Sequence, residues 1–180
     1  MAHISDVPHV KLVCAVCFSQ NVLFPDIEQR LASLLGPVED RSEVFDFSFT
    51  EYYSGEMGSN LKKRFISFTN TIFPGDLPGI KVKTNELEQE YAEHGRRKVN
   101  IDPGYLTGAK LVVASAKNFA HRIYIGKGIY GDLQLQYRHN RFWPHAWTFP
   151  DYQTDTVLQF LEQVRKTYLH GDIHGKIDTV

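Results

Sequence analysis

The sequence predicts a single domain of the α+β class, and its length, composition and order of elements support that prediction. A chain of 180 residues can bury roughly 70% of the surface that its unfolded form exposes, which is enough for one hydrophobic core. The hydrophobic share of 42% and the charged share of 23% are those of a globular protein. Strand-like and helix-like patterns follow in the order β-α-β-β-α-β, which is typical of a ferredoxin-like core. We expect further antiparallel strands and a C-terminal helix to extend that core.

The first two elements are a buried strand and an amphipathic helix. Residues 10–19 form a nearly continuous apolar run rich in valine, which is typical of a strand buried on both faces. Pro25 suits the first turn of a helix, apolar residues then repeat at helical spacing, and Gly36 with Pro37 ends the pattern.

Two further strands and a connection should follow. Phenylalanines alternate within residues 44–49 and a second strand-like run covers 61–70, so Gly55 and Gly58 between them predict a hairpin. Residues 71–83 carry two prolines and two glycines, which predicts an irregular connection too short to separate two domains.

The second half of the chain should complete the sheet. Asn85 is expected to cap a short helix that ends at Gly95, and the strand after it should halt at Pro103. Glycine-containing turns join three further strand-like runs, at residues 110–116, 121–125 and 132–139. A final helix is predicted over 154–169, and residues from about 170 to 180 should form a loose tail.

The charge balance and the N-terminus restrict the classes of partner. The 20 basic and 21 acidic residues give a formal net charge of −1, so no global field attracts nucleic acid or anionic lipid. The N-terminus lacks the pattern of a secretory signal, and no apolar run is long enough to span a bilayer. We therefore expect a cytoplasmic protein with neither a membrane nor a nucleic-acid partner, while a homodimer is compatible with the sequence.

Cys14 and Cys17 lie within the first predicted strand. A step of three residues along a strand sends the two side chains to opposite faces, so we expect two buried thiols and no disulfide. The alternative, a redox C-x-x-C motif, needs a turn that opens a helix. Buried thiols suit a reducing cytoplasm.

Four segments, 51–68, 100–115, 121–137 and 147–155, contain motifs such as NIDPGY, HRIY followed by GIY, and WTFPDY. These segments resemble the signature stretches of a bacterial family of unknown function whose members have about this length. The resemblance covers nearly the whole chain and implies no activity or cofactor. Some members carry a GTP-binding label, but the phosphate-binding motif G-x-x-x-x-G-K-[ST] is absent here.

The motif NIDPGY, residues 100–105, is the strongest candidate for a site. Asp102 could present a carboxylate at the sheet edge while Pro103 and Gly104 make a type II turn. The alternative is that Asp102 only bonds the backbone of its own turn.

Residues 126–131, GKGIYG, satisfy the spacing G-x-G-x-x-G. A dinucleotide fold needs a helix after these glycines, whereas a strand pattern continues here, so we expect a hairpin turn. A strand-loop-strand version of the spacing covers phosphates in protein kinases, and Lys127 would add charge, but no kinase catalytic motif accompanies it.

The hypothesis that joins these signals is a site at the strand ends for a small anionic ligand, a class that includes phosphorylated ligands. Asp102 or His121 would move a proton if the protein is an enzyme, and basic or phenolic side chains would hold the ligand. The proposed ligand-binding residues are Arg64, Tyr105, Lys117, Arg122 and Lys127. The alternative is a non-catalytic interaction or assembly module, and the sequence decides neither the reaction nor a cofactor.

Two other groups of residues are candidates of lower specificity. The first group consists of five carboxylates that could bind a hard cation or act in acid-base chemistry, although their spacing matches no metal-binding motif. They are Glu51, Glu56, Asp102, Asp132 and Asp151. The aromatic stretch 141–152 is too apolar to be only solvated, so it should close the core, line a pocket or meet a partner.

Overall fold

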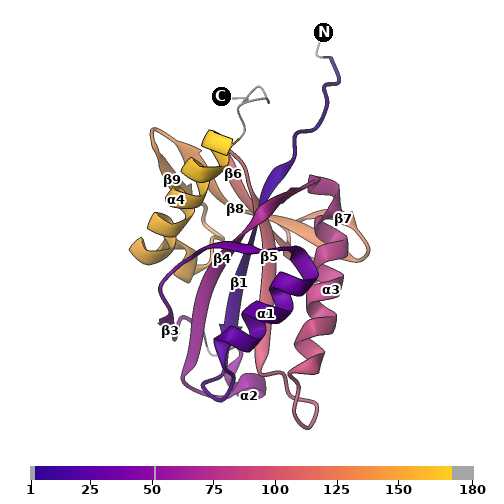
Figure 1. Ribbon diagram of the computed structural model, residues 1–180, viewed down its shortest axis with the longest axis vertical. Helices are drawn as coiled ribbons and strands as arrows, with labels where there is room; N and C mark the ends of the chain where they lie inside the picture. The colour runs from indigo at the N-terminus through magenta and orange to yellow at the C-terminus, as the bar shows by residue number, and fades with distance from the viewer. Residues whose placement is uncertain (1–2, 51, 172–180) are drawn as a thin grey trace.

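A twisted antiparallel sheet with helices on both faces forms the domain (Figure 1). The computed structural model describes residues 3–50 and 52–171, and these form nine strands. The strands are β1 (Val10–Phe18), β2 (Val38–Arg41), β3 (Phe45–Phe47), β4 (Leu61–Ile72), β5 (Val99–Leu106), β6 (Lys110–Ser115), β7 (Ile123–Gly126), β8 (Ile129–Arg138) and β9 (Arg141–Pro144). Their order is β2-β4-β1-β5-β6-β8-β7, with β3 beside β4 and β9 beside β8. The prediction of an α+β domain is therefore confirmed.

The helices cover the two faces of the sheet unequally. They are α1 (Phe24–Leu35), α2 (Ser54–Met57), α3 (Leu77–Glu90) and α4 (Asp155–Gly171), with 3-10 turns η1 (Pro74–Asp76) and η2 (Pro150–Gln153). Helices α1 and α3 share one apolar core with β1, in which Leu12, Ile27 and Leu31 are fully buried. Helix α4 packs on the opposite face through a second core that contains Phe65, Val157 and Leu161.

Strand β1 lies at the centre of the sheet. It pairs antiparallel with β4 on one edge and with β5 on the other, and all nine of its residues are buried. Cys14 faces the core under α1 and α3, while Cys17 faces a small cluster with Phe47 and Met57. Both thiols are buried and free, which confirms the prediction of two thiols on opposite faces.

Strand β5 does not halt at Pro103, and the predicted type II turn at 102–105 is wrong. Residues Val99–Leu106 are continuous strand. The backbone N–H of Ile101 points away from β1 and toward Glu88. In a strand, the backbone N–H groups of residues two apart point to the same edge. The missing N–H of Pro103 therefore faces away from β1, so proline removes no bond from that ladder.

The irregular connection predicted over 71–83 is also wrong. Helix α3 begins at Leu77 and ends at Glu90, so Asn85 lies within it instead of capping it. Pro78 occupies the first turn, where a missing N–H costs nothing and the fixed φ of proline favours the helix.

The remaining elements follow their predictions more closely. The turn between β7 and β8 consists of Lys127 and Gly128, whose φ values of 53° and 74° are those of a tight hairpin turn. The hairpin expected between β3 and β4 exists, but it carries the short helix α2, and β2 was not predicted. Residues 172–180, which include most of the predicted tail, lie outside the described residues. No helix within the described ranges has the length and apolar character needed to cross a bilayer.

Candidate functional site

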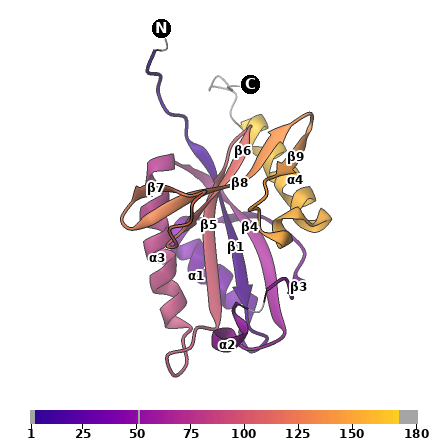
Figure 2. The ribbon, with the colours of Figure 1, turned by 180° about the vertical axis from the view of Figure 1, so that it is seen from behind.

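The sheet splits between β5 and β6, and a cavity lies at the split. The two strands pair from Gly104 to Leu106. Beyond this paired segment, toward the start of β5, strand β6 continues beside β8 and leaves one edge of β5 open. Figure 2 shows this half of β5 running beside α3. A cavity of about 650 Å³ opens there. Its lining comes from Phe47, Phe49, Thr50, Tyr52, Tyr53, Lys63, Lys81, Asn85, Glu88, Gln89, Arg97, Asn100, Asp102, Ser115, Ala116, Lys117, Phe119, Arg122, Phe149, Pro150 and Asp151.

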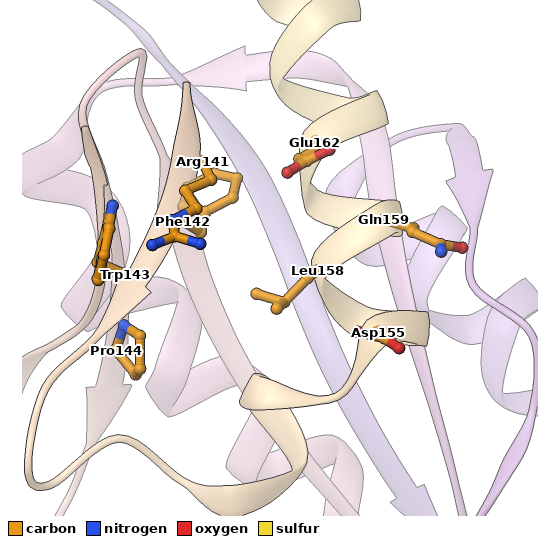
Figure 3. A pocket seen from close by; sticks show the side chains of 8 residues that line it. All are labelled: Arg141, Phe142, Trp143, Pro144, Asp155, Leu158, Gln159 and Glu162. Carbon is orange, nitrogen blue, oxygen red and sulfur yellow. The ribbon is translucent and has the colours of Figure 1, made fainter. Parts of the chain in front are cut away.

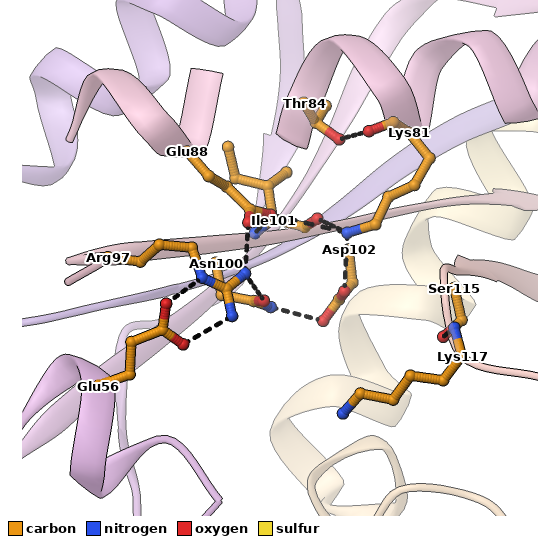
Figure 4. A network of polar contacts seen from close by, with 10 residues as sticks. All are labelled: Glu56, Lys81, Thr84, Glu88, Arg97, Asn100, Ile101, Asp102, Ser115 and Lys117. Carbon is orange, nitrogen blue, oxygen red and sulfur yellow. Dashed lines mark hydrogen bonds and ion pairs between the residues drawn. The ribbon is translucent and has the colours of Figure 1, made fainter. Parts of the chain in front are cut away.

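Side chains of α3 satisfy the open edge of β5 (Figure 4). The Lys81 ammonium donates to the Ile101 carbonyl at 2.6 Å, and the Ile101 N–H donates to the Glu88 carboxylate at 2.7 Å. Lys81 and Glu88 are seven residues apart and so lie on one face of the helix. These two side chains supply the bonds that a neighbouring strand would otherwise make.

Asp102 presents an ionised carboxylate to the cavity. Its Oδ1 lies 3.3 Å from Lys81 Nζ, its Oδ2 accepts from Asn100 Nδ2 at 2.9 Å, and its side chain is 19% exposed. Burial alone would raise the pKa of Asp102, but Lys81, Lys63 and these hydrogen bonds outweigh it and hold the pKa below its usual value.

Arg97 joins this network to α2. Its Nε and Nη2 bind both oxygens of Glu56, at 2.7 and 2.8 Å, and its Nη1 donates to Glu88 at 2.6 Å. The hydrogen bonds from Arg97 lower the pKa of Glu56. Burial raises the pKa of Glu88, although Lys81 and the Ile101 N–H oppose that shift. Two carboxyl groups on one arginine thus have pKa values displaced in opposite directions.

Arg122 also lines the cavity, and three hydrogen bonds hold its guanidinium. Its Nε donates to the buried Asp132 carboxylate at 2.7 Å, and its Nη1 donates to Ser115 Oγ at 2.6 Å and to the Lys117 carbonyl at 3.1 Å. The guanidinium carbon lies 4.5 Å from the centroid of the Phe119 ring. Among the described residues, Nη2 donates no hydrogen bond. Arg122 therefore offers the cavity a fixed cation with unused donors.

Lys117 and a group of aromatic rings stand at the same cavity. Lys117 Nζ lies 3.5 Å from the centroid of the Tyr52 ring, and within residues 3–50 and 52–171 no carboxylate is in ion-pair contact with it. Figure 4 shows the Lys117 side chain extending on the same side as Asp102 and Asn100. Phe47 packs against Phe49 and Tyr53, with ring centroids 5.8 and 5.9 Å apart.

A buried ion pair closes the cavity toward α4. Lys63 Nζ lies 2.7 Å from Asp151 Oδ2, and both side chains are at most 5% exposed. The rings of Phe47, Phe65 and Tyr152 surround the ammonium at 4.8 to 5.6 Å. The aromatic stretch 141–152 thus contributes to the core through Tyr152 and to the cavity through Phe149.

The structure brings together three of the seven predicted site residues. Asp102, Lys117 and Arg122 line the cavity. His121 lies beside it, stacked on Trp147 at 5.2 Å, with Nε2 3.5 Å from Asp132 Oδ2.

The other three lie elsewhere. Arg64 donates to the Ser42 carbonyl and covers the Phe24 ring. Tyr105 packs in a separate cluster with Leu77 and Ile129, because it points to the face opposite Asp102. Lys127 lies in the β7–β8 turn and lines a different cavity, next to Gly79. The concave surface predicted for Asp102, Tyr105, His121 and Arg122 therefore holds only for Asp102 and Arg122.

Sequence reasoning missed Lys63, Lys81, Glu88 and Arg97. The spacing of Lys81, Asn85 and Glu88 places them on one helical face, a signal that becomes visible only if α3 is extended back to Leu77. Of the candidate carboxylates, Glu51 lies outside the described residues. Among the residues that the structure describes, no three His, Cys, Asp or Glu side chains cluster as metal ligands would.

A second concavity of about 390 Å³ lies between β9 and α4 (Figure 3). It is lined by Arg141, Phe142, Trp143, Pro144, Asp155, Leu158, Gln159 and Glu162. The Arg141 guanidinium covers the Trp143 ring at 3.8 Å, and the charged side chains of this groove are not buried. It lacks the preorganised charge of the cavity at β5, which is the stronger candidate site.

Comparison with known proteins gives one match. Residues 8–168 match a protein-family model described as a domain of unknown function (DUF4416). No curated protein and no solved structure matches the chain.

Proposed function

Because the chain belongs to the DUF4416 family of unknown function, its function has to be inferred from the cavity, and we propose that the cavity binds a small anionic ligand. The observation that carries this proposal is the anchored guanidinium of Arg122, whose Nε and Nη1 are fixed by protein acceptors while Nη2 has no acceptor within residues 3–50 and 52–171. A cation that is already oriented and desolvated loses little freedom when it binds a carboxylate or phosphate.

The charged side chains around the cavity also bear on this proposal. Five basic side chains line it against three carboxylates, Glu88, Asp102 and Asp151. Asp132, which pairs with Arg122, and Glu56, one of the two carboxylates that pair with Arg97, are not part of the lining, but each lies 2.7 Å from its arginine. With these two carboxylates counted, five cations meet five carboxylates, so the support comes from Lys117, which has no carboxylate in ion-pair contact within residues 3–50 and 52–171.

Asp102 indicates a second chemical group that the ligand should carry. Its ionised carboxylate accepts hydrogen bonds, so it suits a hydroxyl or ammonium group of the same ligand. In a catalytic version of the proposal Asp102 is the candidate that reaches the cavity, whereas His121 stacks on Trp147; because its pKa is held low, Asp102 would orient a hydroxyl or ammonium group and act only as a weak base. We also propose two properties of the chain as a whole. The strand order β2-β4-β1-β5 supports a ferredoxin-like core. The two free thiols support a cytoplasmic location.

Isothermal titration calorimetry and thermal shift with inorganic phosphate and acetate test the proposal. A ligand at one hundred times its Kd stabilises the native state by about 2.7 kcal/mol, which should raise Tm by roughly 5–10 °C. Lys117→Gln should weaken binding severalfold, whereas Lys110→Gln, an exposed lysine on β6 outside the cavity, should not. If neither phosphate nor a carboxylate binds the wild-type protein, the proposal is wrong.

The second candidate function is an interaction module that pairs through β7. This strand ends the sheet, and its Ile123 and Tyr124 side chains are 75% and 60% exposed. Unpaired edge strands with apolar side chains are where further strands add. Scattering that shows a concentration-dependent dimer, together with no response to anions, would favour this module.

A further inference from the structure

We infer that the anion bound in the cavity at β5 carries a planar aromatic ring next to its charged group. This inference rests on the proposed function and specifies the class of ligand. It follows from the aromatic side chains that line the cavity and from their position beside the two cations.

Three aromatic side chains of the lining are unusually exposed. Phe49, Tyr52 and Phe119 expose 39%, 58% and 51% of their surface, respectively. Large apolar side chains left open inside a concave site are typical of ligand pockets, because a ligand can remove that surface from water. The folded chain alone leaves these three rings only partly buried.

The exposed rings adjoin the cations that would bind the anionic group. Lys117 Nζ lies 3.5 Å from the Tyr52 centroid, and the Arg122 guanidinium carbon lies 4.5 Å from the Phe119 centroid. A ligand whose charge meets these cations would place its next atoms against the two rings. Offset or edge-to-face contact with such rings requires a planar partner at centroid distances of about 4.5–7 Å.

The size of the cavity agrees with such a ligand. Its volume of about 650 Å³ falls within the range of roughly 300–1,000 Å³ that is usual for small-molecule sites. Inorganic phosphate would meet only the cations and leave the rings exposed. An aromatic phosphate or carboxylate would contact both groups.

The test compares three phosphates by calorimetry on the full-length protein: inorganic phosphate, phenyl phosphate and cyclohexyl phosphate. The last two bury similar apolar area but differ in planarity. We expect phenyl phosphate to bind about threefold to tenfold more tightly than cyclohexyl phosphate, the usual effect of aromatic contacts beyond burial. Benzoate and cyclohexanecarboxylate form the matching carboxylate pair.

Variants locate the effect. Phe49→Leu and Tyr52→Leu keep an apolar side chain but remove a ring, so each should reduce the phenyl-to-cyclohexyl preference. Tyr124→Leu is the matched control, because Tyr124 is 60% exposed but lies outside the cavity. Equal affinity for the ring pairs, with inorganic phosphate still bound, would overturn this inference alone. Absence of binding by every anion would overturn the proposed function as well.

Discussion

The two ends of β5 satisfy the backbone N–H and C=O groups on the edge away from β1 by different means. From Gly104 to Leu106 the strand has neighbours on both edges, β1 and β6, and its side chains lie in apolar clusters. From Val99 to Pro103 the described part of the chain gives it one strand neighbour, β1, and Lys81 and Glu88 take the place of the second strand. A missing strand is thus replaced by charged side chains, and these leave room for a cavity that a strand would have filled.

The largest effect should come from Lys81→Met, which tests whether side chains do replace the strand. Removing the ammonium leaves Glu88 and Asp102 without their shared cation and the Ile101 carbonyl without its donor. Breaking a buried charge network in this way costs about 3–5 kcal/mol of unfolding free energy. Urea unfolding should measure that loss, and Lys83→Met, an exposed lysine on the same helix, is the control. Equal stability of the two variants would show that the network adds nothing.

A smaller loss is expected from Gly104→Ala at the closed end of β5. A Cβ at this position would lie 2.6 Å from the Val112 carbonyl oxygen and 3.2 Å from Val113 Cα, so β5 and β6 would have to move apart. Such overpacking costs about 1–3 kcal/mol. Gly55→Ala is the control, since nothing lies within 4 Å of a Cβ built there. Unfolding midpoints of the two alanine variants that coincide would contradict the close approach.

Glu56→Gln should have a weaker effect that depends on pH. Hydrogen bonds from Arg97 lower the folded-state pKa of Glu56 below its ordinary 4.5. A lowered pKa adds stability that is present above the unfolded-state value and is lost as pH falls through the folded-state value. At pH 7 the variant should lose about 0.5–1 kcal/mol, because the pair is partly exposed. The difference from wild type should shrink below pH 4.5, as measured by urea unfolding across pH. Glu43→Gln, at an exposed position, should show no comparable change.

The smallest effect concerns the reactivity of the two thiols. Burial raises the pKa of Cys17 to about 12, and burial likewise raises the pKa of Cys14. Since the thiolate is the reactive form, neither residue should be labelled by a thiol reagent at pH 8 in the native protein. Both should react in 8 M urea, which serves as the positive control. Rapid labelling of the folded protein would contradict their burial.

The sequence was informative where one local pattern decides the structure. Valine-rich β1, the helical repeat of α1 and the Lys127-Gly128 turn each carry their own signal. The error at Pro103 arose because proline stops a strand only if its missing N–H faces a partner, and the pairing edge is not a local property. The error at α3 arose in the same way, since prolines and glycines inside a helix depend on their position in it.

Prediction of the site was limited by distance along the chain. Asp102, Lys117 and Arg122 could be joined because short connections link β5, β6 and β7. Lys63 and Lys81 reach the same cavity from β4 and α3, and no spacing rule brings these elements together. Tyr105 was misplaced because a continuous strand turns alternate residues to opposite faces, whereas a turn would have kept it beside Asp102.

The central position of β1 also affects how the nascent chain folds during synthesis. This strand leaves the ribosome before both of its partners, which end at Ile72 and Leu106. At about 5–20 residues per second, the apolar run of β1 waits roughly 5–20 s for its second partner. Burial of β1 therefore depends on pairings distant in sequence, which are slow to form and leave the nascent strand open to aggregation. A molecular chaperone that shields this segment during synthesis should raise the yield of folded protein more than one added after release.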